Sequence, residues 1–136
     1  MSPDRFIPAG THITHEERMS DAFHKFHLSD GRALHRFTAG EPDAEPHDHP
    51  GRLEIEILAG SYVEQVFDPD TWSSKLIVRY RGTRHVIEPQ HIHRIPRLLE
   101  ADCWTLCRYG PHVRESRFWR WTGRVESRAW NEAWPT

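Results

Sequence analysis

Two closely spaced pairs of histidines are the residues of this sequence best suited to chemistry. The chain holds 11 histidines in 136 residues, and four of them form the patterns His47-Asp48-His49 and His91-Ile92-His93. Because side chains two apart on a strand point to the same face, each pair can present two imidazoles to one interior. Imidazole suits Fe, Zn, Ni or Cu. Chance gives about one such pair at this composition, so the second pair and the sequence context decide the interpretation.

The elements that must position these histidines are short strands. Turn signals such as Ala59-Gly60, Arg81-Gly82 and Gly110-Pro111 separate short runs of β character from residue 33 onward. This texture predicts an all-β sandwich or barrel. The expected strands are Ala33–Thr38, Leu53–Leu58, Ser61–Phe67, Lys75–Arg81, His85–Ile87, Ile92–Ile95, Cys103–Tyr109 and Arg117–Trp121.

One short N-terminal helix is expected before the strands. Thr14 and Glu17 have capping-box spacing, and apolar residues from Met19 to Phe26 follow at helical intervals. These signals predict a helix over roughly residues 15–26. A chain of this length fits one domain. We expect a helical arm over residues 1–32, a barrel over 33–121 and a Trp-rich tail over 122–136.

The sequence around His47 resembles the first motif of the cupin family. That motif is a Gly, an H-x-H pair, a Glu three or four residues later, and a hydrophobic strand that ends in Gly. The second motif supplies a single later His. The matching residues here are Gly40, His47, His49, Glu54 and Ile57-Leu58-Ala59-Gly60 for the first motif, and Gly82, Pro89 and His93 for the second.

A branch of small bacterial and phage cupins is similar to this chain over roughly residues 33–119. The resemblance implies an RmlC-like jelly-roll barrel with a divalent transition metal (Fe, Ni, Zn or Mn) at His47, His49 and His93, and it carries no known reaction. The chain departs from the branch at Gly51-Arg52, where members tend to have Trp-Asp. The shared segments are Leu34-His35-Arg36-Phe37, His47-Asp48-His49-Pro50, Ile57-Leu58-Ala59-Gly60-Ser61-Tyr62-Val63-Glu64, His93-Arg94-Ile95, Trp104-Thr105-Leu106 and Gly110-Pro111.

Two residues, Glu54 and Leu53, compete for the position of the fourth metal ligand. Counting from His49 puts Glu54 at the ligand position, whereas counting back from Gly60 puts Leu53 there. Strand alternation agrees with the second count, because Leu53, Ile55 and Ile57 would then face the core and Glu54 the solvent. Glu54 is therefore a candidate ligand with a strong competitor.

Four further residues are candidates for substrate chemistry. His91 shares the strand face of His93 and could act as a base, a fourth ligand or a polar lining residue. Tyr62 could point inward as an acid or orienting group. Arg36 and Arg94, which lie beside motif positions, are candidate clamps for an anionic substrate, because guanidinium meets carboxylate in a bidentate way. Any single arginine of this kind is more often a salt-bridge partner than a clamp.

Composition narrows the classes of partner and compartment. A net charge of −2 argues against nucleic acid as a partner, and no apolar run approaches a membrane span. No signal peptide is visible, so a cytoplasmic location is the default. Cys103 and Cys107 read as reduced core thiols. The tail, with Trp119, Trp121, Trp130 and Trp134, either clamps the barrel or forms an oligomer interface, and we expect a homodimer.

Three functions fit these residues. The first is a dioxygenase-like metalloenzyme that acts on a small, anionic substrate, because three imidazoles on Fe(II) leave open positions. The second is a non-catalytic module that binds a metal or a small ligand. The third is a metal-free isomerase or epimerase that uses His and Tyr as base and acid.

Overall fold

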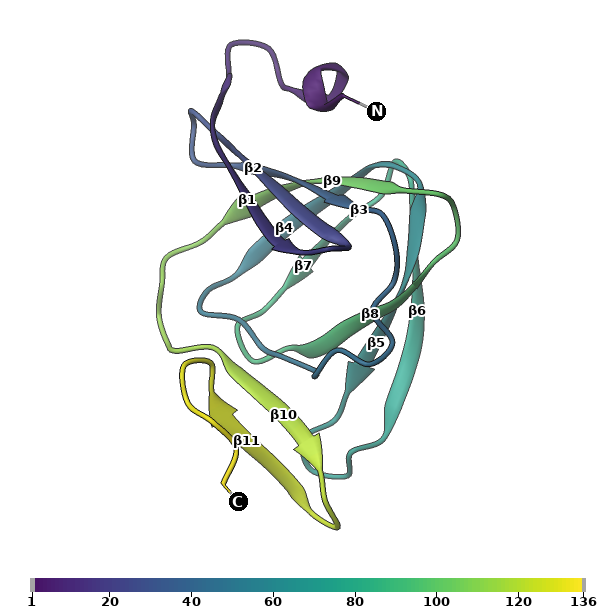
Figure 1. The fold of residues 1–136 in the computed structure, drawn as a ribbon, viewed down its shortest axis with the longest axis vertical. Coiled ribbons are helices and arrows are strands. Elements are labelled where there is room, and N and C mark those ends of the chain that lie inside the picture. Colours follow the sequence, from purple (N-terminus) through teal and green to yellow (C-terminus); the bar gives the residue numbers. More distant parts are fainter. Residues whose placement is uncertain (1, 136) are drawn as a thin grey trace.

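The structure is a computed structural model that describes residues 2–135, and its regular elements are almost all β-strands (Figure 1). Each of the eight strands expected after residue 33 is present, and the all-β prediction is confirmed. The elements are η1 (Pro3–Phe6), β1 (Ile13–Ser20), β2 (Phe23–Leu28), β3 (Ala33–Phe37), β4 (Leu53–Ala59), β5 (Ser61–Phe67), β6 (Ser74–Tyr80), β7 (Arg84–Ile87), β8 (Ile92–Leu98), β9 (Cys103–Tyr109), β10 (Arg117–Trp121) and β11 (Val125–Ala129).

Two antiparallel sheets enclose the interior of the barrel. The larger sheet has the order β1-β2-β3-β9-β4-β7, and the smaller one has the order β6-β5-β8. Their shared core takes apolar side chains from β4, β5, β7 and β9. Cys103 and Cys107 are free and buried in it, as expected. The other buried members are Ile55, Ile57, Tyr62 and Ile87.

The helix expected over residues 15–26 is wrong, because this segment forms the hairpin of β1 and β2. The capping-box residues bond across the hairpin instead of along a helix. The Thr14 hydroxyl donates to the His27 carbonyl at 3.2 Å, and Glu17 lies 2.9 Å from the His27 ring. On β2, Phe26 and Leu28 are buried at the period of two that a strand requires. The hairpin adds two strands to the edge of the larger sheet.

The N-terminal segment covers the outer face of that sheet. The Phe6 ring lies 4.9 Å from the Trp104 ring, between centroids, and Phe26 stacks on the same indole at 5.7 Å. Trp104 is fully buried by these contacts although it points away from the barrel core. The helix η1 has four residues, and the described part of the chain contains no helix long and apolar enough to cross a membrane.

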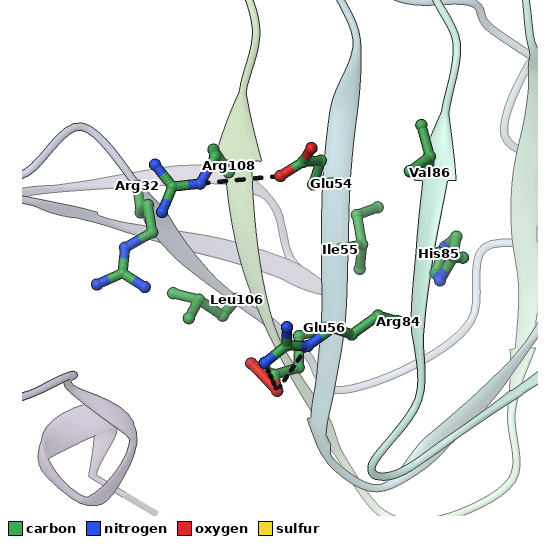
Figure 2. Close-up of a pocket in the computed structure, with 9 residues that line it drawn as sticks. All are labelled: Arg32, Glu54, Ile55, Glu56, Arg84, His85, Val86, Leu106 and Arg108. Atoms are coloured by element: carbon green, nitrogen blue, oxygen red, sulfur yellow. Dashed lines mark hydrogen bonds and ion pairs between the residues drawn. The ribbon is translucent and has the colours of Figure 1, made fainter.

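Alternation along β4 separates the core from a charged outer groove. Ile55 and Ile57 are buried, as expected, whereas Glu54 and Glu56 point outward to arginines (Figure 2). Arg84 donates to Glu56 at 3.3 Å, and Arg108 lies 3.8 Å from Glu54. The outer groove is therefore lined by paired charges.

The C-terminal segment forms the β10–β11 hairpin, at the opposite end of the barrel from the N-terminus (Figure 1). The buried carboxylate of Asp48 ties it to the loop that precedes β4. One oxygen accepts the Arg117 backbone N–H at 2.6 Å, and the other accepts Arg114 Nη2 at 3.0 Å and Trp119 Nε1 at 3.1 Å. Trp119 thus holds the tail against the barrel, whereas Trp121 and Trp130 are exposed.

A buried histidine stands inside the larger sheet. His35 on β3 is hydrogen-bonded to the Tyr109 hydroxyl at 2.7 Å. Burial, reinforced by the Lys25 charge, lowers the pKa of His35 to about 3. This imidazole is therefore neutral in the folded protein at physiological pH.

The Asp48 carboxylate should be a large local contribution to stability. Replacing it with Ala removes the acceptor of Arg114 Nη2, the Arg117 backbone N–H and Trp119 Nε1, which should cost about 3–5 kcal/mol of unfolding free energy in urea denaturation. The exposed Glu54→Ala is the control and should cost about 0.5 kcal/mol or less. A change below 1 kcal/mol for Asp48→Ala would contradict this role for the carboxylate.

Acid should destabilise the protein partly through His35. Its pKa is about 3 when folded and about 6.5 when unfolded. Between these values only the unfolded chain binds the proton, so the contribution of His35 is present above pH 6.5 and is lost as the pH falls toward 3. From pH 7 to pH 5, His35→Gln should lose about 2 kcal/mol less stability than the wild type. Chemical denaturation at the two pH values measures this difference. If the wild type and His35→Gln lost the same unfolding free energy between pH 7 and pH 5, His35 would protonate freely in the folded protein.

Candidate metal centre

The loop that carries His47 and His49 is bound directly to strand β8. The His47 backbone N–H donates to the His93 carbonyl, and the His93 N–H donates to the His47 carbonyl, both at 3.0 Å. The His49 N–H donates to the Pro89 carbonyl at 2.9 Å. These bonds bring together two segments that lie more than 40 residues apart in sequence.

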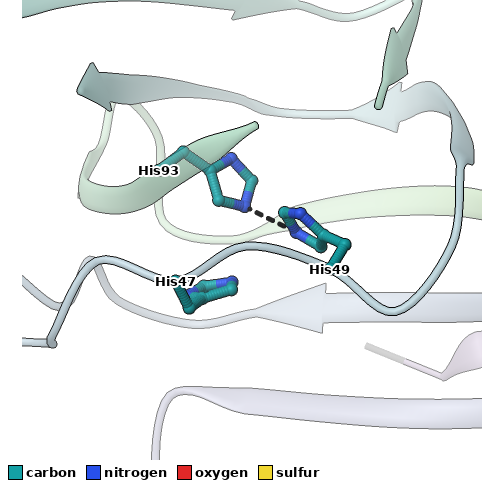
Figure 3. A group of neighbouring side chains, drawn as sticks. All are labelled: His47, His49 and His93. Carbon is teal, nitrogen blue, oxygen red and sulfur yellow. Dashed lines mark hydrogen bonds between the residues drawn. The ribbon is translucent and has the colours of Figure 1, made fainter. Parts of the chain in front are cut away.

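The three histidine rings converge on one point (Figure 3). Their centroids lie 4.7–5.2 Å apart, and a set of possible ligand nitrogens, one from each ring, lies within 4.8 Å of one another. The closest pair is His49 Nε2 and His93 Nε2 at 3.1 Å. The predicted His47, His49 and His93 set is thus brought together by the fold.

Electrostatics keep these rings neutral. Burial lowers the pKa of His47 to about 3 and that of His49 to about 2, and the neighbouring His93 adds to both shifts. The pKa of His93 is also lowered by burial, against the opposing effect of a carboxylate bonded to it. A neutral imidazole keeps a nitrogen lone pair, which is the form that binds a metal.

The carboxylate bonded to His93 is Glu64, a site residue that sequence reasoning did not assign. It lies on β5, fully buried, with Oε2 at 2.5 Å from His93 Nδ1 and 2.8 Å from His91 Nε2. Arg79 donates to the other oxygen through Nε and Nη2, at 3.0 and 2.7 Å. A signal was present: Glu64 is two residues from Tyr62, so an inward Tyr62 implies an inward Glu64.

Glu64 is ionised and fixes the orientation of the His93 ring. Burial by itself raises the pKa of Glu64, but the hydrogen bonds with His91, His93 and Arg79 outweigh it and hold the pKa well below its usual range. An ionised carboxylate only accepts hydrogen bonds, so His93 Nδ1 must carry the donated proton. His93 Nε2, which faces His49, is then left with its lone pair.

The other predicted residues take different places. Glu54 lies on the outer face of β4, bonded to Arg52 at 3.3 Å, and is not gathered with the three histidines. Arg36 binds Asp102 at 3.3 Å and lies over Trp104, on the side of β3 opposite His35. Arg94 donates to the Gln65 side chain and to the Ala44 carbonyl, on the side of β8 opposite His93.

Tyr62 and His91 lie beside the site in different ways. Tyr62 is buried, borders the cavity described below and has its hydroxyl 3.4 Å from His85 Nε2. Burial, with the Glu64 charge, raises the pKa of Tyr62, so it is a neutral phenol. His91 is bonded to Glu64 and remains partly exposed at the end of β8.

A cavity of about 530 Å³ opens onto the three histidines. Ligand pockets typically measure about 300–1,000 Å³. Its walls are largely apolar and come from both sheets and from the loop before β4. They include Phe23, Phe37, Leu53, Ile55, Ile87 and Ile95.

The donor set fits a bound divalent metal. Two nitrogens that bind one ion at about 2.0–2.1 Å, at an angle of roughly 90–110°, lie about 2.8–3.4 Å apart. The 3.1 Å separation of His49 Nε2 and His93 Nε2 falls in this range. His49 Nδ1 is buried without a hydrogen-bond partner in the described part of the chain, so no hydrogen bond engages this nitrogen.

Comparison with known proteins gives fold-level similarity only. No protein-family model and no curated protein matches the chain. Among solved structures, the hydroxypropylphosphonic acid epoxidase of S. wedmorenis superposes with a TM-score of 0.57 at 14% identity, over 74% of this chain and 56% of the epoxidase. Fe(II) HppE superposes with a TM-score of 0.53 at 10% identity, over 76% of this chain and 62% of the HppE chain. The Drosophila melanogaster CENP-C cupin domain superposes with a TM-score of 0.56 at 10% identity, over 74% of this chain and 76% of that domain. The chain is thus a protein of the cupin fold.

Proposed function

We propose that this protein is a metal-binding cupin that modifies a small molecule, with a divalent transition metal held by His47, His49 and His93. The observation that carries the proposal is the convergence of three neutral imidazoles, two of whose Nε2 atoms lie 3.1 Å apart. Their position at the end of an apolar cavity supports a role in chemistry on a ligand bound there.

Fe(II) is the metal we favour among Fe, Ni, Zn and Mn. A set of three histidines accepts each of these ions, so the ligands alone do not determine which metal binds. A structural neighbour that is an Fe(II) protein, the HppE epoxidase, supports iron. With three protein ligands, such an ion supplies Lewis-acid and redox chemistry at its open positions, as a dioxygenase-like reaction requires.

The surrounding residues have separable roles in this proposal. Glu64 orients His93, and His91 supports Glu64 from the solvent side. Tyr62 offers a neutral phenol to a substrate in the cavity, as a hydrogen-bond donor or acid. The apolar walls exclude water, which strengthens each polar contact made inside.

A binding role without catalysis is the second candidate. One structural neighbour is a CENP-C domain bound to the protein CAL1, so the cupin fold also serves protein partners. Here the histidines face an internal cavity of about 530 Å³, which a small molecule fits better than a protein surface does. Metal binding with no reaction on any small molecule would favour the second candidate.

Metal content should depend on the three histidines. Protein purified without an affinity tag and loaded anaerobically with Fe(II) should bind about one equivalent, and His47→Ala, His49→Ala or His93→Ala should weaken binding by about 100-fold or more. His12→Ala, at an exposed histidine, is the control. Metal analysis and oxygen uptake with small acids, thiols and amino acids are the measurements. Unchanged metal content in a His47→Ala/His49→Ala variant would refute the site.

Glu64 should act on metal affinity without being a ligand. Glu64→Gln preserves the shape but removes the charge that holds the proton on His93 Nδ1, and it should weaken metal binding about 10- to 100-fold. Glu54→Gln, at the position reached by counting from His49, should leave affinity unchanged. Competition with a chromophoric chelator measures both. Loss of affinity in Glu54→Gln alone would reverse the assignment of these two carboxylates.

A further inference from the structure

The cavity has one wall built from aromatic side chains of β2 and β3. Phe23 pairs with Phe37 across these strands, and Lys25 pairs with His35, so all four side chains share one face. The Phe23 and Phe37 rings stack at 4.6 Å between centroids, and Phe23 meets His35 at 5.0 Å. Tyr109 completes the wall through its hydrogen bond to His35.

Lys25 is a cation on this wall without an acidic partner. No carboxylate among residues 2–135 forms an ion pair with its ammonium, which lies 5.6 Å from the Phe23 ring centroid and 5.7 Å from that of Tyr109. Glu17, its register partner on β1, is hydrogen-bonded to His27 and interacts with the Lys25 charge beyond ion-pair distance.

The other charged groups that border the cavity are already engaged. Arg52 is paired with Glu54 and Glu88, and Asp48 with Arg114. Glu41 accepts a hydrogen bond from the Ser20 hydroxyl.

Arg94 also borders the cavity, but its guanidinium donates to the Gln65 side chain and to the Ala44 carbonyl. Lys25 is thus the cation of the aromatic wall, and its ammonium makes no hydrogen bond or ion pair to other residues of the described chain.

We propose that the cavity binds a small apolar carboxylic acid, with its carboxylate on the Lys25 ammonium and its body against Phe23 and Phe37. This inference deepens the proposed function, on which it rests, by naming the substrate class of the same site. One ammonium beside aromatic and aliphatic side chains matches a carboxylate monoanion that carries an apolar body. The anion-binding role expected of Arg36 and Arg94 thus passes to Lys25.

Calorimetric titration of the full-length protein tests this proposal. The probes are 3-phenylpropanoate and octanoate, each compared with its neutral amide, in Fe(II)-loaded and in chelator-treated protein. In the wild type the acids should bind about tenfold more tightly than the amides, which is the increment of one charge-assisted hydrogen bond. Lys25→Met should reduce that ratio to about twofold or less. Lys75→Met, at an exposed lysine on β6, should keep it.

The outcomes separate this inference from the metal proposal. Equal binding of acid and amide by the wild type, a preserved preference in Lys25→Met, or no binding of either probe by metal-loaded protein would overturn the inference and leave the metal site standing. Lys25-dependent binding of the acids by protein that takes up no metal would support the inference and refute the metal proposal. Circular dichroism of Lys25→Met verifies its fold, and Lys25→Arg should retain the preference if the positive charge is what the acid meets.

Discussion

The geometry of the histidine site depends on one buried carboxylate. Glu64 has no exposure to solvent, and removing an ion from water costs several kcal/mol. Partners on both neighbouring strands offset that cost: Arg79 comes from β6, while His91 and His93 come from β8 or its start. Because β5 is the central strand of the smaller sheet, this cluster locks all three strands together and sets the direction of the His93 ring.

A second buried carboxylate, Asp48, holds another part of the site in place. Asp48 separates His47 from His49 in sequence, and its oxygens face away from them, toward donors on the C-terminal segment. One carboxylate therefore orients the histidine of β8, and the other holds the loop that carries the remaining two. Neither contributes an atom to the convergence of the three rings.

Much of the barrel could be predicted from sequence because its strands are short, apolar and separated by turn residues. The proximity of His47, His49 and His93 was implied by the resemblance to the two cupin motifs, together with strand parity. The β1–β2 hairpin could not be predicted, since its apolar residues satisfy helical spacing and strand spacing alike, and only pairing with β3 decides between them. The position of Lys25 in the cavity wall depends on that same hairpin.

Strand parity also explains which candidate residues belong to the site. Arg36 and Arg94 are immediate neighbours of the inward His35 and His93, so they had to point outward on regular strands. Glu54 points outward because it is next to the inward Ile55. Glu64 points inward because it is two residues from the inward Tyr62. Counting from the H-x-H pair leads to Glu54 on the outer face of β4, because the loop after His49 does not keep strand geometry until β4 begins.

The Asp48 connection makes the C-terminal hairpin an energetic part of a site to which it gives no ligand. Any equilibrium in which β10 and β11 loosen must also break the Asp48 bonds of the loop that carries His47 and His49. By thermodynamic reciprocity, whatever binds the histidines then favours the docked hairpin to the same degree that the docked hairpin favours binding. Binding at the histidines would in this way change the population of the docked hairpin on the outer surface, where the exposed Trp121 and Trp130 lie.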